Sequence, residues 1–78
     1  MVAFSKKKIE LTALKKGKRA RIIKVGGEDI KRRKLFALGL LPGEMVTLEQ
    51  RFPVLLVKIG HSYVALDEDI GRNILVTV

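Results

Sequence analysis

The hydrophobic period of this chain changes from helical to extended at one short junction, and that change constrains most of what the chain can fold into. From residue 44 onward apolar and polar residues alternate. Alternation with period 2 is the pattern of strands that bury one face. The inward positions that it predicts are Val46, Leu48, Leu55, Val57, Ile59, Val64, Leu66, Ile74, Val76 and Val78. The second half of the chain is therefore expected to form strands, with residues 54–66 as a hairpin.

The first half contributes a helical turn and one more strand. The stretch LTALKKGK (residues 11–18) predicts a short helical turn, with Thr12 as its N-cap and Gly17 as its left-handed stop. The next stretch, RARIIKV (residues 19–25), alternates only loosely. This indicates a strand that either contains a bulge or is buried on both faces.

One helix is expected between that strand and the alternating half. Glu28 and Asp29 begin it, where the helix dipole favours negative charge, and it runs to about residue 38. Gly39 supplies a left-handed cap, and Pro42-Gly43 fits the centre of a type II turn. The chain is thus predicted to be mainly β with one short helix. Five short antiparallel strands favour a small five-stranded barrel, because closure removes exposed strand edges.

Charge is distributed unevenly along the 78 residues. Thirteen of the sixteen Lys and Arg residues lie within residues 1–34, whereas residues 35–78 carry more acids than bases. This asymmetry indicates an anionic partner for the first half, or a solvated cationic surface around a small core. The chain has no Cys, and it has neither a signal-peptide pattern nor an apolar run long enough to span a membrane. A cytoplasmic protein is expected, with residues 1–10 as a basic N-terminal extension and residues 11–78 as the domain.

The residues that catalysis requires are missing. His61 is the only histidine, no Cys nucleophile exists, and no nucleophile elbow can be assembled. The glycines of KVGGEDIKRRK lack the spacing of a phosphate-binding loop. The sequence therefore predicts that the protein is not an enzyme and needs no cofactor.

Two binding functions remain as alternatives on residue chemistry. A metal-binding module would use His61 with Asp67, Glu68 and Asp69, although Asp67 is also a helix N-cap candidate. A small RNA-binding barrel would use the clusters SKKK, KKGKRAR and KRRK against phosphates. Its aromatic residues are few, however: they are Phe4, Phe36, Phe52 and Tyr63. No DNA binding is expected.

The order of several segments resembles a known family. LTALKKGKRARI, GG, RRKLFALGLLPGEMVTL, PVLLVKIGHSYVAL and IGRNILV follow one another as in FeoA, the small partner of the ferrous-iron transporter FeoB. They are also similar to the FeoA-like SH3-type domain that ends repressors of the diphtheria-toxin-repressor kind. The resemblance covers Leu11 to Val78 and implies an SH3-like barrel. It also implies a non-catalytic cytosolic accessory protein that binds the cytosolic part of FeoB and supports or regulates iron uptake.

The resemblance also assigns roles within the junction. Leu35 and Leu38 are expected to dock the helix over the barrel, Gly39 to end it, and Pro42 and Gly43 to start the next strand. We call these five the structural residues.

A partner-binding surface is predicted from composition beside them. Arg32, Arg33 and Phe36 have the composition of an interface hot spot, and Leu40 or Leu41 offers an apolar anchor where it is exposed. Alternatively, Phe36 packs under the turn at residues 60–62 or under another loop, and the two arginines are simply solvated. The expected partner face is acidic, so that binding weakens with salt. Recruitment to the inner face of the membrane by that partner, and self-association, are further expectations.

Overall fold

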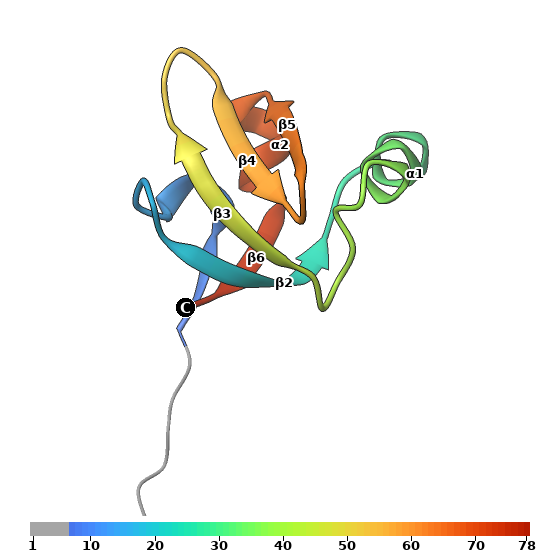
Figure 1. Cartoon of the computed structure of the whole chain (residues 1–78). Coiled ribbons are helices and arrows are strands. Elements are labelled where there is room, and N and C mark those ends of the chain that lie inside the picture. Colours follow the sequence, from blue (N-terminus) through green and yellow to red (C-terminus); the bar gives the residue numbers. More distant parts are fainter. Residues whose placement is uncertain (1–6) are drawn as a thin grey trace, which may run out of the picture.

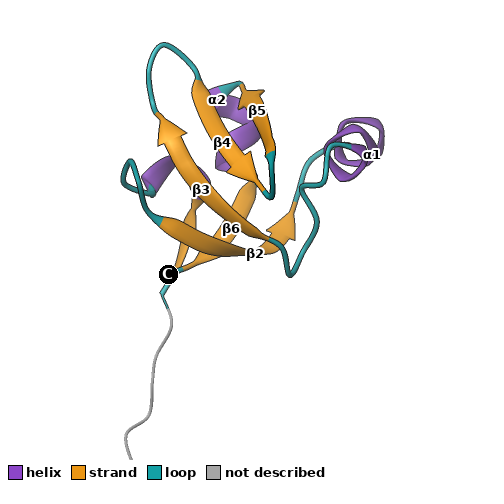
Figure 2. Ribbon diagram, in the orientation of Figure 1, coloured by secondary structure: helices purple, strands orange, loops and turns teal. Residues whose placement is uncertain are grey.

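The computed structural model describes residues 7–78 as a strongly bent β-sheet accompanied by short helices (Figures 1 and 2). In chain order the elements are β1 (Lys8–Glu10), the 3-10 helix η1 (Leu11–Ala13), β2 (Arg19–Val25), α1 (Asp29–Ala37), β3 (Met45–Gln50), β4 (Leu55–Ile59), β5 (Ser62–Leu66), α2 (Glu68–Arg72) and β6 (Ile74–Thr77). The predicted helix, the hairpin of β4 and β5 and the last strand are confirmed. Residues 1–6 of the expected extension lie outside the described residues.

The six strands form one antiparallel sheet in the order β1-β6-β2-β3-β4-β5. The prediction of a closed five-stranded barrel is therefore wrong in strand number and in closure, because β1 and β5 are the two edges. The additional strand is β1, in which Ile9 pairs with Val76. Three residues are too few for a period to be visible in the sequence, so this strand was counted with the basic extension.

Helical segments cover part of the core between the two sheet edges. Helix α2 contacts η1 and β6 (Figure 2). Gly71 makes this approach possible, because a Cβ atom there would lie 2.5 Å from Leu55 Cδ1 and 3.0 Å from Thr12 Cγ2. The packing of η1 and α2 buries apolar surface of the core here. In a closed barrel, paired strands would bury that surface instead.

The core consists of apolar side chains, and residues 7–78 contain no buried polar or charged residue. Eight of the ten inward positions that alternation predicts are buried, and Ile59 is partly buried against the core. Val78 is the exception, at 52% exposed. It lies beyond β6, which ends at Thr77, so the alternation of the strand no longer fixes its side chain.

A bulge in β2 explains its loose alternation. The register with β6 shifts between Ile22 and Lys24, and Ala20, Ile22 and Val25 are all buried. One extra residue turns Val25 back to the inner face. Of the two options left open by the sequence, the bulge is therefore the one that the structure contains.

The turn before β2 differs from the prediction at its first residue. Thr12 lies inside η1, and the N-cap position belongs to Glu10. The Thr12 hydroxyl donates to Glu10 Oε1 at 3.2 Å, so it does not cap a backbone amide. Gly17 does adopt the expected left-handed conformation, with φ of 86°. The helical turn starts two residues earlier than predicted, because Leu11 is completely buried and begins it.

Candidate functional site

Helix α1 lies beside the sheet, at the opposite side of the molecule from the C-terminal residue in Figure 1. It begins at Asp29 after Glu28, and the chain leaves it through Gly39, whose φ is 96° and whose amide donates to the Phe36 carbonyl at 3.0 Å. A positive φ is unfavourable for residues with a Cβ, so glycine ends the helix abruptly here. Only one side of α1 is therefore fixed to the rest of the protein.

The side of α1 that faces solvent carries apolar side chains among cationic ones. Ile30, Ala37 and Leu38 fall within one sector of the helix at 100° per residue, and all three are exposed. Ile30 is 68% exposed and Leu38 is 52% exposed. Leu41, just after the helix, is 40% exposed. We call the following set the α1 surface: Ile30, Lys31, Arg33, Lys34, Ala37, Leu38 and Leu41.

The opposite side of α1 packs against the core. Leu35 is buried, and Phe36 is half-buried against the core cluster. Arg32 is half-exposed and pairs with Asp29 one turn earlier. Of the two placements left open for Phe36, packing against the rest of the protein is the one that the structure contains. Leu38, which was expected to pack inward beside Leu35, is exposed instead.

The predicted partner residues divide in two. Arg33 and Leu41 are exposed and belong to the α1 surface, whereas Leu40 has no exposed surface. Leu40 cannot be an interface anchor, because its side chain fills the core just after Gly39. Its amide donates to the Leu35 carbonyl at 3.0 Å, which holds the exit of the helix against its last turn.

The structural residues are mostly placed as predicted. Leu35 is buried and Gly39 ends the helix, while Gly43 has a φ of 95° as a type II turn requires at its second central position. The Gly43 amide donates to the Ile22 carbonyl at 2.7 Å, and Arg21 donates to the Gly43 carbonyl at 2.7 Å. This turn, with the exposed Pro42 at its first central position, connects the start of β3 to β2. Leu38 is the exception, because Leu40 takes the buried position expected for it.

The residues predicted as metal ligands do not come together. His61 lies in the turn between β4 and β5, and Asp67 follows the far end of β5. Glu68 and Asp69 instead pair with Arg72, at 3.8 and 3.0 Å. Within residues 7–78 no group of three or more His, Cys, Asp or Glu residues could hold a metal ion.

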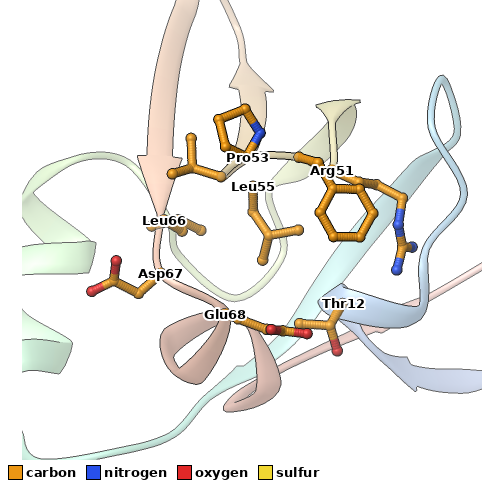
Figure 3. Close-up of a pocket in the computed structure, with 9 residues that line it drawn as sticks. Thr12, Arg51, Pro53, Leu55, Leu66, Asp67 and Glu68 are labelled. Carbon is orange, nitrogen blue, oxygen red and sulfur yellow. The ribbon is translucent and has the colours of Figure 1, made fainter.

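Figure 3 shows a small hollow beside two of those carboxylates. It measures about 110 Å³, with Leu55 and Leu66 toward the core and Arg51 and Glu68 near its sides. The Asp67 and Glu68 carboxylates point in different directions, so they do not form a common ligand set. Asp67 occupies the N-cap position of α2 as predicted, but its side chain makes no capping hydrogen bond.

Two aromatic side chains relevant to RNA binding are exposed but lie on different elements. Tyr63 is 58% exposed on β5, with Lys58 Nζ 5.8 Å from its ring centroid. Phe52 is 79% exposed in the loop between β3 and β4. Phe4 lies outside the described residues. The described part of the sheet thus presents a single ring to stack a base.

Comparison with known proteins assigns the chain to a family. A sequence model described as the FeoA domain matches residues 9–78. The chain belongs to the FeoA family. Membership implies a role in ferrous iron transport, and the family is not known as one of enzymes. The resemblance predicted from the order of the segments is confirmed.

Solved FeoA structures share the SH3-like fold of this FeoA protein. FeoA from Chlorobium tepidum is 26% identical, with a TM-score of 0.85 over 90% of this chain and 70% of that chain. FeoA from Stenotrophomonas maltophilia, solved with zinc and described as a prokaryotic SH3 domain protein, is 29% identical. Its TM-score is 0.73, over 85% of this chain and 86% of that chain.

A repressor contains the same fold as one part of a longer chain. IdeR from T. acidophilum is 26% identical, with a TM-score of 0.84 over 91% of this chain but only 34% of that chain. No curated protein matches the sequence. Among residues 7–78, no helix is long and apolar enough to cross a membrane.

Proposed function

We propose that this FeoA protein is a non-catalytic cytosolic accessory protein that binds the cytosolic part of an FeoB-type transporter through the α1 surface. The observation that carries this proposal is the exposed apolar sector of α1, formed by Ile30, Ala37 and Leu38. A helix of a small monomer normally turns such a sector toward its own core. Here the core receives the other side of the helix, so the apolar sector is free for a partner.

The charges around that sector indicate the chemistry of the partner. Lys31, Arg33 and Lys34 are exposed on the α1 surface, and the described ion pairs do not include them. Apolar side chains interspersed with cationic ones fit a partner that offers apolar contacts within an acidic surface. Rim charges of this kind accelerate association and are screened by salt, so the complex is expected to weaken as salt rises.

Aromatic placement favours this function over RNA binding. A single-strand platform combines a basic track with several rings on which bases stack. Tyr63 is one ring on the sheet, and Lys58 already lies over it. The apolar surface on α1 consists of aliphatic side chains, which suit a protein partner better than bases.

The test is binding of the purified protein to the GTPase region of FeoB from the same organism, with and without nucleotide. The test variant replaces both Ile30 and Leu38 with Ser, and the control replaces Val54 and Tyr63 with Ser. All four side chains are exposed, so neither pair removes core packing. We expect at least tenfold weaker binding for the test variant, about the loss of one well-packed contact, and no change for the control.

Two results would contradict the proposal in different ways. Equal affinities for wild type and the test variant would remove the α1 surface as the contact. Absence of binding in every nucleotide state, both to the GTPase region and to the full-length transporter, would remove FeoB as the partner.

A further inference from the structure

A second basic site lies at the other end of the molecule from α1. It is an open hollow of about 540 Å³ between β1, the loop that joins η1 to β2, and the residue after β6. Hydrogen bonds shape its sides, since the Val78 amide donates to the Lys7 carbonyl at 3.2 Å and the Lys18 amide to the Lys15 carbonyl at 3.0 Å. In Figure 1 this end, marked by the C-terminus, is remote from α1.

Four cationic side chains line this hollow, and no acidic side chain does. They are Lys7, Lys15, Lys18 and Arg19. The ion pairs of the described residues involve only Arg32 and Arg72, so carboxylates neutralise none of the four. Arg19 also lines an adjoining hollow that contains Arg21, which extends the positive surface along β2. Like charges gathered without counter-charges favour an anionic ligand.

The remaining lining is aliphatic. Leu14 is 2% exposed and forms part of the core, and Ile9 is partly buried against that core. Among residues 7–78, no aromatic side chain lines the hollow, so this part of the chain offers a base no ring on which to stack. A cationic rim over an aliphatic floor fits an amphiphile, with an anionic head and an apolar body.

We propose that this hollow binds the headgroup region of anionic phospholipids and so docks the protein on a membrane surface. The four cations contact lipid phosphates, and the aliphatic floor receives the glycerol and upper acyl carbons. Because α1 lies at the other end of the molecule, the protein can contact a membrane and a protein partner at once. This site is independent of the proposed FeoB contact, and each is tested by its own variants.

The test is co-sedimentation with vesicles of phosphatidylglycerol and phosphatidylcholine, with pure phosphatidylcholine vesicles as the neutral reference. A cation near an anionic leaflet strengthens binding roughly fivefold. Lys15→Gln with Lys18→Gln should therefore weaken binding about thirtyfold. The control, Lys31→Gln with Lys34→Gln, removes the same charge from α1 and should retain most of the binding.

Glycerol phosphate and inorganic phosphate serve as soluble competitors. A membrane site predicts that neither displaces the protein from vesicles at matched ionic strength, because they lack the apolar part. Equal losses for the two Lys pairs would overturn the proposal in favour of diffuse charge attraction. Tight binding to single-stranded RNA together with no binding to anionic vesicles would overturn it in favour of a nucleic acid.

Discussion

Leu40 and Leu41 are neighbours with opposite expected roles, and replacing each with Ala separates them. Leu40 has no exposed surface, whereas Leu41 is 40% exposed. Removing a fully buried leucine side chain costs about 2–5 kcal/mol, because the lost transfer free energy is joined by the cost of the cavity. A domain of this size is stable by only about 4–12 kcal/mol. Leu40→Ala is therefore expected to remove a large fraction of the free energy of unfolding.

Leu41→Ala should cost about 1 kcal/mol or less, because solvent already reaches the side chain and no cavity forms. Urea unfolding followed by circular dichroism measures both variants, with the slope of the transition checked for constancy. The thermal midpoint of Leu40→Ala should fall by about 8 °C or more. Hydrogen exchange should also show faster opening of α1 in Leu40→Ala, since the Leu40 amide bonds to Leu35 at the helix end.

Equal losses of stability in the two variants, or a larger loss in Leu41→Ala, would contradict this prediction. Either result would mean that Leu41 carries the packing between the helix exit and the core. It would also return Leu40 to the list of candidate interface residues, where the sequence first placed it.

Three further predictions concern Gly71 in α2, Gly39 after α1 and His61 between β4 and β5. Gly71→Ala should lower the free energy of unfolding by about 1 kcal/mol, because the cost of overpacking against Leu55 exceeds the gain in helix propensity. Urea unfolding measures this loss, and adding Leu55→Val should recover part of it. A gain in stability for the single variant would instead show that Leu55 moves freely. Gly39→Ala should cost roughly 1–2 kcal/mol of stability through its positive φ, because a Cβ atom there would only reach ordinary van der Waals contact with Ile59 Cγ2, at 3.8 Å. A variant as stable as wild type in the same assay would contradict this. Ferrous or manganous ion should shift the thermal midpoint of wild type and of His61→Ala by the same amount. A rise in wild type alone would restore His61 as a candidate metal ligand.

Most of the secondary structure was predictable because its signals are local. The alternation at Val46 and Leu48, the glycine after α1 and the Pro42-Gly43 turn each act within a few residues of themselves. The strand β1 was not predictable in this way, since a strand of three residues is defined by its partner β6. The open edges of the sheet were not predictable either. Whether the sheet closes depends on where η1 and α2 pack, which is not a local property of the sequence.

The candidate site was predictable in place but not in orientation. The sequence located helix α1, but Leu38, which was expected to pack over the sheet beside Leu35, is exposed. A helical wheel identifies the apolar sector and assumes that a neighbouring element covers it. Helix α1 instead lies beside the sheet, and Leu35, Phe36 and Leu40 attach it through the other side. When no neighbouring element covers the apolar sector of a helix, the sector indicates an interface. When an element covers it, the sector belongs to the core.

The basic first half of the chain is one feature in the sequence but two surfaces in the structure. Lys15 and Lys18 line the hollow by β1, and Lys31 and Lys34 lie on α1 at the opposite end. Both proposed complexes rely on cations, so raising the salt concentration should weaken the lipid complex and the protein complex alike. Salt dependence therefore cannot tell which partner occupies which surface. Charge-matched variants can, because each removes two positive charges from one end only. Lys31→Gln with Lys34→Gln should lose FeoB binding and retain vesicle binding, whereas Lys15→Gln with Lys18→Gln should lose vesicle binding and retain FeoB binding. Both results together would require two separate sites.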